Sequence, residues 1–414
     1  MPLIKSSIQK TDTNEITLSN NTLNNIGSVS IQTENQNLDN NNYVQKNANQ
    51  TSQEYNSNQV MNQFYKIIEI AVKLNASDIH ISPNYPPIVR LNGKLEKLNL
   101  PILSAEYTEQ LKQILLKEKN YLQNKKIFNE QSSYDIAYKV NNTRLRINIY
   151  KISTGNSFSC RIINNEIKTL DDLHIPKIVE KFINFPNGLV LVTGPTGSGK
   201  STTIASLLNC INKTQKKHII TLEDPIEYIF QQVNCLIEQR EFNSDFTSWD
   251  DALKSVLRQD PDIIFVGEMR DYQTIESTLR LAETGHLVFA TLHTNSASET
   301  IDRIIDIFPE NKHEQIRIQL ASVLRTIISQ RLINTNTGSR MPAVEILINN
   351  SAVRNYILEK LNSQIDNIIQ TSLDTGMISM ERSLVNLVKK GLISITEAKL
   401  NSLKPNDIDI LLKN

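Results

Sequence analysis

The chain has 414 residues, of which 39% are hydrophobic and 21% are charged, and its 44 basic side chains balance 44 acidic ones. This composition is typical of a soluble protein with enough length for two or three domains. It argues against a strongly basic nucleic-acid-binding protein, and the chain lacks the run of about 20 apolar residues that a membrane-spanning helix needs.

The first part of the chain, residues 1–57, is rich in Asn, Gln, Ser and Thr and contains few large apolar side chains. Such a segment cannot bury enough apolar surface to offset the entropy that it would lose on ordering. We therefore predict a disordered tail. Two interpretations stay open, a tail that binds a partner or compositional drift in a chain rich in Asn, Lys and Ile.

A small α/β domain is predicted over residues 58–165. Its first segment carries apolar residues at helical spacing, and three later segments alternate apolar and polar side chains as strands do. The helical residues are Phe64, Ile67, Ile68, Ala71 and Val72, and the strand segments are 78–81, 88–91 and 144–150.

A connector over residues 166–185 leads into a larger predicted domain over residues 186–350. Short apolar runs alternate there with helical patterns. The alternation predicts a buried parallel sheet with helices on both faces and a ligand at the carboxyl ends of the strands. The apolar runs are 189–193, 219–222, 263–266 and 287–291, and the helical patterns are 202–211, 249–259, 272–283 and 297–306.

The sequence after residue 311 predicts mainly helices, with a helical C-terminal region over 351–414 and one candidate strand at 342–347. The apolar face of the first helix is predicted to carry Ile316, Leu320, Val323, Leu324, Ile327 and Ile328.

The segment Gly194–Ser201 has the pattern G-x-x-x-x-G-K-S between a predicted strand and a predicted helix, as a phosphate-binding P-loop requires. Its glycines let backbone N–H groups surround the phosphates of ATP, Lys200 reaches the β- and γ-phosphates, and Ser201 offers a hydroxyl to Mg²⁺. A P-loop that binds nucleotide without hydrolysing it is the alternative. The predicted nucleotide-binding residues are Gly194, Pro195, Thr196, Gly197, Ser198, Gly199, Lys200, Ser201 and Thr202.

Two acidic strand ends accompany the P-loop. Glu268 follows the apolar run 263–266, and Glu223 follows 219–222. A carboxylate at such a position can hold a metal ion or orient the attacking water, which favours a hydrolase over a passive nucleotide binder. Capping of the next helix is the alternative role for Glu268. A third strand is flanked by His286 and His293, which we expect to lie where strand ends meet the ligand.

Four ordered motifs resemble those of the secretion ATPases, the hexameric motors of type II secretion and type IV pili. They are the P-loop, ITLEDPIEY at 220–228, VGEMRD at 266–271 and AETGHLVFATLHT at 282–294. The similarity extends to ASDIHISP at 76–83, PPIVRLNG at 86–93 and IDRIIDIFP at 301–309, and it covers roughly residues 60–400. The resemblance implies a RecA-like P-loop NTPase core with a parallel sheet, a smaller PAS-like α/β N-terminal domain and a helical C-terminal region.

Within this family the chain is most similar to the pilus-retraction (PilT) branch. Members of the pilus-assembly and type II secretion branch usually carry a four-cysteine zinc module, which the widely spaced Cys160, Cys210 and Cys235 cannot build. The chain has Leu358 where a second arginine of a retraction signature is expected. An accessory pilus ATPase of the PilU type and an assembly or secretion ATPase therefore stay open as alternatives.

The resemblance also implies a ring of six subunits, with ATP bound between the N-terminal domain of one subunit and the P-loop domain of the next. Glu268 would activate water, Glu223 would support it, and His293 would sense the γ-phosphate. Arg144, Arg146 and Arg161 are candidates for completing the neighbouring site, with surface salt bridging as their alternative role.

The implied partners are an inner-membrane pilus platform protein and a paralogous pilus ATPase, without nucleic acid. We expect a cytoplasmic protein that works peripherally at the inner membrane, where hydrolysis rotates one domain against the other.

Overall fold

The computed structural model describes residues 57–91, 93–118, 133–141, 143–163 and 166–413, together with three two-residue strands nearer the N-terminus. Those strands are β1 (Gln9–Lys10), β2 (Ile16–Thr17) and β3 (Ile31–Gln32). The predicted disordered tail lies, apart from these strands and Ser57, outside the described residues. The chain divides into two compact units, residues 1–165 and 166–414, and each is described by itself.

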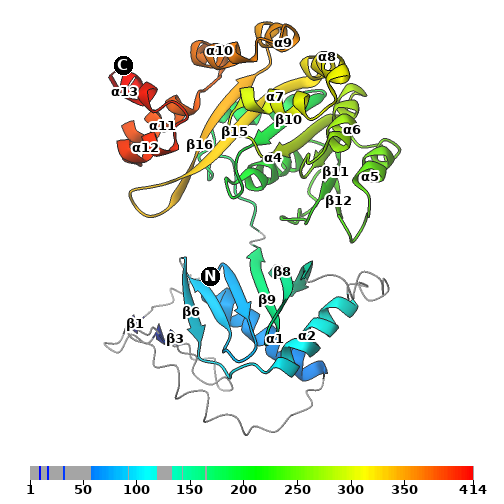
Figure 1. The fold of residues 1–414 in the computed structure, drawn as a ribbon, viewed down its shortest axis with the longest axis vertical. Helices are drawn as coiled ribbons and strands as arrows, with labels where there is room; N and C mark the ends of the chain where they lie inside the picture. Colours follow the sequence, from blue (N-terminus) through cyan, green and yellow to red (C-terminus); the bar gives the residue numbers. More distant parts are fainter. Residues whose placement is uncertain are drawn as a thin grey trace. The chain divides into compact units, whose positions relative to one another are not determined.

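In its described residues the first unit consists of a seven-stranded antiparallel sheet, two helices and the separate strand pair β1–β2 (Figure 1). Its strand order is β3-β6-β5-β4-β9-β8-β7, and the predicted strands at 78–81, 88–91 and 144–150 are all present. The elements are α1 (Ser57–Lys73), β4 (Asp78–Ile81), β5 (Ile88–Leu91), β6 (Lys94–Leu98), α2 (Ala105–Glu118), β7 (Ser133–Val140), β8 (Thr143–Ile152) and β9 (Gly155–Ile163).

One face of this sheet packs against both helices. Fully buried Phe64 from α1 and Leu111 from α2 share a hydrophobic cluster with Ile79, Ile147 and Cys160 of the strands. Because side chains alternate across a strand, the neighbouring polar residues Asp78, Arg146 and Arg161 lie on the other face.

The second unit is built on a seven-stranded sheet with the order β12-β11-β13-β14-β10-β15-β16. All pairs are parallel except β15 with β16, so the predicted parallel sheet is confirmed. The strands are β10 (Gly188–Thr193), β11 (His218–Glu223), β12 (Leu236–Glu241), β13 (Ile263–Val266), β14 (Leu287–Leu292), β15 (Leu324–Asn334) and β16 (Arg340–Ile348).

Helices cover both faces of this sheet, as its all-apolar central strands require. Alternate residues of β10 enter opposite clusters: Leu191 packs with α5, α6, α7 and α8, whereas Val190 packs with α4 and the 3₁₀ helix η2. These helices are η2 (Lys177–Asn184), α4 (Lys200–Thr214), α5 (Trp249–Val256), α6 (Tyr272–Glu283), α7 (Ala297–Asp306) and α8 (His313–Val323).

The prediction of one helix carrying both Ile316 and Ile328 was wrong. Helix α8 ends at Val323, and the chain continues directly into β15, which pairs with β10 in parallel and with β16 antiparallel. The residues at helical spacing beyond Val323 are equally suited to a strand that is buried on both faces, and pairing with β10 decides the outcome. The candidate strand at 342–347 is confirmed as part of β16.

The end of the chain is helical. Its helices are α9 (Ser351–Leu358), α10 (Ile365–Thr371), α11 (Met380–Lys389), α12 (Ile395–Asn401) and α13 (Pro405–Lys413), with short 3₁₀ turns η3 (Glu310–Lys312), η4 (Asn362–Gln364) and η5 (Leu373–Thr375) elsewhere in this unit. Helix α11 packs against β16 through buried Met380 and Leu384 (Figure 1). Among the described residues, no helix combines the length and the hydropathy that crossing a bilayer requires.

Candidate functional site

The P-loop connects the carboxyl end of β10 to the first residue of α4, at the edge of the sheet where parallel strands place their ligands. Gly194 and Gly199 have φ angles of 145° and 88°, which side chains other than glycine rarely adopt. A Cβ atom at Gly194 would clash with the backbone carbonyl oxygen of Gln330 on β15. The loop therefore needs glycine at Gly194 for both its conformation and its close contact with β15.

Lys200 is buried, and its ammonium group lies within the loop. Nζ donates to the carbonyl oxygens of Gly194 at 2.8 Å and Pro195 at 3.1 Å, and lies 3.4 Å from Nδ1 of His293. Burial lowers the pKa of Lys200, although the charge of Glu268 acts in the opposite direction. The loop thus concentrates one positive charge beside several backbone N–H groups, which is the chemistry of a phosphate site.

Glu268 and His293 lie side by side beyond the ends of β13 and β14, which are neighbouring strands. Nε2 of His293 is 3.2 Å from Oε1 of Glu268, while the other carboxylate oxygen accepts from Nε of Arg270 at 2.7 Å. Burial and the charge of Lys200 lower the pKa of His293, so the neutral ring is favoured. In that form Nδ1 accepts from Lys200 and Nε2–H donates to Glu268.

Glu223 is the last residue of β11 and is buried. Its carboxylate accepts from Thr221 Oγ1 at 2.7 Å and from Gln239 Nε2 at 3.2 Å. Burial raises the pKa of Glu223 to about 7, which leaves a large fraction of the group protonated near neutrality. Glu223 is therefore suited to holding or exchanging a proton.

The alternative capping role of Glu268 is contradicted. Asp271 caps α6 instead, because its side chain accepts from the backbone N–H of Thr274 at 2.8 Å. The expectation for His286 was also wrong: this residue precedes β14 at the amino end of the strand, where Nδ1 contacts Thr284 Oγ1 and Leu281 O, both at 3.1 Å. The two ends of a strand lie at opposite edges of the sheet, so of these two histidines His293 is the one at the P-loop edge.

The sequence interpretation missed Gln330, which supports the P-loop from β15. Its Nε2 donates to the carbonyl oxygen of Ser198 at 2.7 Å, and its Oε1 accepts from Thr203 Oγ1 at 2.7 Å. Gln330 was missed because its segment was assigned wrongly; a glutamine one residue beyond a buried Ser in an apolar strand is the signal that could have identified it. A second missed contact joins the hydroxyls of Thr202 and Tyr228 at 2.8 Å.

The candidate arginines belong to the first unit. Arg161 forms an ion pair of 3.0 Å with Asp78, and its side chain is 68% exposed; Arg146 Nε lies 3.9 Å from Asp135. Arg146 and Arg161 are direct partners across β8 and β9. The exposed position of Arg161 is compatible with completing the site of a neighbouring subunit. Its ion pair with Asp78 agrees equally with the alternative role, surface salt bridging.

The residues of the P-loop fit a bound nucleotide. Within the part of the chain that the structure describes, the hydroxyl of Ser198 is buried without a hydrogen-bond partner, so this polar atom faces a site where an acceptor would satisfy it. Ser201 is the second residue of α4, directly after Lys200, and its hydroxyl is of the oxygen type that Mg²⁺ prefers.

A family model supports the same conclusion from the sequence side. Residues 53–388 match the model described as type II/IV secretion system protein, which is well over half of the 414 residues. The matched range contains the P-loop, both acidic strand ends and His293.

Two curated proteins and one solved structure are similar to most of the chain. The type IV pilus retraction ATPase PilT of Pseudomonas aeruginosa is 41% identical over 335 residues, which covers 81% of this chain and 96% of that protein. A twitching motility protein of Neisseria gonorrhoeae is 43% identical over 315 residues, covering 76% and 83% respectively. A crystal structure of the pilus retraction motor PilT with bound ADP matches with a TM-score of 0.75 at 41% identity, covering 84% of this chain and 98% of that chain.

Proposed function

This chain belongs to the type II/IV secretion system protein family, and on that premise we propose that it is the motor that retracts type IV pili. The chain is an ATPase of this family, similar to PilT in sequence and in structure. Retraction is the function named for PilT of Pseudomonas aeruginosa, which this chain matches over 96% of that protein's length, and the similarity to the PilT crystal structure supports carrying it over to this chain.

The observation that carries the proposal is the continuous contact from Lys200 through His293 to Glu268. The two distances, 3.4 Å and 3.2 Å, connect the phosphate-binding ammonium to the carboxylate at the end of β13. A protein that only bound nucleotide would need the P-loop but no carboxylate and imidazole next to it. The arrangement supports hydrolysis instead.

We propose the following division of roles. Lys200 exchanges the carbonyl oxygens of Gly194 and Pro195 for phosphate oxygens when ATP binds. Glu268 orients the attacking water and accepts its proton. Neutral His293 contacts both Lys200 and Glu268, so it couples the position of Glu268 to the presence of the γ-phosphate. Glu223, whose pKa is raised to about 7 by burial, holds a proton close to this edge of the sheet. Ser201 would hold Mg²⁺, which supplies charge neutralisation at the phosphates.

The working assembly is proposed to be a ring of six subunits. Exposed Arg161, with Arg146 beside it on the sheet, would reach the nucleotide of the neighbouring subunit and stabilise charge on the transferred phosphoryl group. The ring would act at the cytoplasmic side of the inner membrane on a pilus platform protein, with a paralogous ATPase as a further partner.

Deleting the gene and counting surface pili tests the direction of the motor. Loss of a retraction motor leaves pili extended, so the count should rise well above that of the parent strain, and a plasmid copy of the gene should restore it. Loss of all pili would contradict retraction and favour assembly, and an unchanged count would favour an accessory role.

A further inference from the structure

A buried carboxylate outside the nucleotide site joins the ends of two helices. Glu345 lies on β16, is 6% exposed, and accepts from the backbone N–H of Ala297, the first residue of α7, at 2.7 Å. It also accepts from the backbone N–H of Met380, the first residue of α11. Two helix N-termini therefore meet on one carboxylate, where both dipoles favour negative charge.

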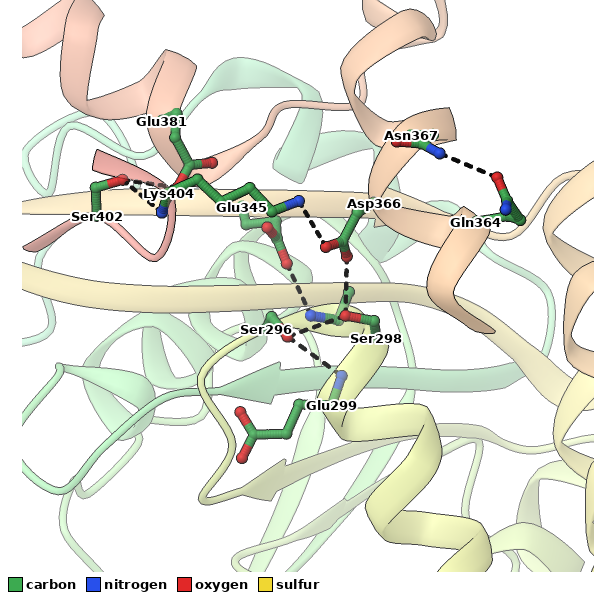
Figure 2. A network of polar contacts seen from close by, with 11 residues as sticks. Ser296, Ser298, Glu299, Glu345, Gln364, Asp366, Asn367, Glu381, Ser402 and Lys404 are labelled. Carbon is green, nitrogen blue, oxygen red and sulfur yellow. Dashed lines mark hydrogen bonds and ion pairs between the residues drawn. The ribbon is translucent and has the colours of Figure 1, made fainter. Parts of the chain in front are cut away.

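A second contact reaches the same turn of α7. Oδ1 of Asp366 on α10 accepts from Ser298 Oγ at 2.9 Å, and its other oxygen accepts from Lys404 Nζ at 2.8 Å (Figure 2). Lys404 lies between α12 and α13, and its backbone N–H donates to Glu381 at 3.2 Å. Figure 2 shows these side chains gathered around Glu345, so that Lys404 provides the positive charge among three carboxylates.

The first turn of α7, which Glu345 and Asp366 contact, follows closely in sequence after His293 of the nucleotide site. Only three residues separate His293 from Ala297, and each is fixed to the start of α7. Thr294 Oγ1 lies 2.7 Å from Thr300 Oγ1, the backbone N–H of Asn295 donates to Glu299 at 2.8 Å, and Ser296 caps the helix. A shift of the first turn of α7 would therefore move the imidazole relative to Lys200 and Glu268.

We propose that Glu345 and Lys404 are positioning residues for ATP hydrolysis, which hold the first turn of α7 and thereby His293 in register with the P-loop. The C-terminal helices α11–α13 then set the rate of turnover without touching the nucleotide. This inference rests on the proposed role of His293.

The same row of the sheet carries a link to the P-loop itself. Glu345 pairs with Ser329 across β15 and β16, Ser329 pairs with Thr193 across β10 and β15, and the Thr193 and Ser329 hydroxyls lie 2.9 Å apart. Thr193 immediately precedes Gly194. Glu345 is therefore connected to His293 through the first turn of α7, and to the start of the P-loop through Ser329 and Thr193.

Substituting Lys404 tests the proposal with the full-length protein. Lys404 is half-exposed, so Lys404→Ala should fold and keep the melting temperature of the wild type within a few degrees. We expect kcat for ATP hydrolysis to fall about 3- to 10-fold with KM for ATP within about twofold, because the P-loop contacts are unchanged. Lys404→Arg should retain most of the activity. Lys399→Ala is the matched control, since Lys399 pairs with Asp409 within the same group of helices and both side chains are half-exposed, as Lys404 is.

A double-mutant comparison separates positioning from a general loss of structure. In a His293→Ala background, Lys404→Ala should cause no further loss of kcat, because the group that it positions is gone. Three results would each overturn the inference. The first is a double variant whose loss of kcat is the product of the two single losses. The others are a Lys404→Ala rate equal to that of Lys399→Ala and a His293→Ala rate equal to that of the wild type. A wild-type protein without ATPase activity would contradict the proposed function instead.

Discussion

His293 Nε2 lies 3.2 Å from Glu268 Oε1, so the imidazole and the carboxylate at the ends of two neighbouring strands form a hydrogen-bonded pair. Lys200, on the other side of the ring, fixes which nitrogen carries the proton, because an ammonium group cannot accept a hydrogen bond. The imidazole therefore connects the P-loop lysine to Glu268 through one contact on each ring nitrogen.

Glu268→Gln should retain ATP binding and lose hydrolysis. Glutamine keeps the size and the hydrogen bond of glutamate but cannot take a proton from water, and general bases typically contribute a factor of about 100 or more. Binding is measured with a fluorescent ATP analogue and turnover by phosphate release. Glu276→Gln is the control, because it alters a carboxylate of α6 that pairs with Lys312. If Glu268→Gln hydrolyses ATP at the wild-type rate, Glu268 is not the base.

Gln330→Ala should weaken ATP binding by about tenfold. The substitution removes the hydrogen bond from β15 to the P-loop residue Ser198 and leaves the Thr203 hydroxyl of α4 buried without its acceptor, a loss of about 1 to 3 kcal/mol. KM for ATP and the affinity of the fluorescent analogue report the change. Gln319→Ala on α8 serves as the control, because the side-chain amide of Gln319 bonds exposed Glu283, away from the P-loop. Equal KM values for Gln330→Ala and Gln319→Ala would show that Gln330 does not support the P-loop in ATP binding.

Much of this site was accessible from the sequence, because central parallel strands are continuous apolar runs that end in polar residues. Strands β10, β11, β13 and β14 follow that rule, and so Lys200, Glu268 and His293 could be placed on one edge of the sheet. Gln330 and Glu345 could not, because their positions depend on β15 pairing with β10, across more than 100 residues of sequence. Strand β12 was missed for another reason: it is a polar edge strand without a clear alternation.

Melting temperature should fall as the pH rises from 5 to 8, and Glu345→Gln should reduce that fall. Burial, with the charges of Asp366 and Glu381, raises the pKa of Glu345 from 4.5 to about 7. Between these values the folded protein holds a proton that the unfolded chain releases, so the free energy of unfolding decreases with rising pH. We expect Glu345→Gln to remove about 1 to 2 kcal/mol of the decrease, or several degrees. Glu283→Gln, an exposed change, should leave it intact, and parallel curves for the wild type and Glu345→Gln would refute the assignment.

Mixing two inactive variants tests whether the site is shared between subunits. Arg161→Ala and Lys200→Ala should each abolish most ATPase activity when assayed alone. In a random mixture about a quarter of the sites combine an intact P-loop with an intact neighbouring Arg161, so activity should return. A mixture as inactive as its components would mean that Arg161 acts within its own subunit or serves only as the partner of Asp78.

The central claim is that hydrolysis at the P-loop retracts pili. The most direct measurement counts retraction events of fluorescently labelled pili in a deletion strain that expresses either the wild-type chain or Lys200→Ala at equal levels. The wild type should restore retraction, and Lys200→Ala should leave the pili extended, because the ammonium that holds the phosphates is missing. Retraction at the wild-type frequency with Lys200→Ala would contradict the account.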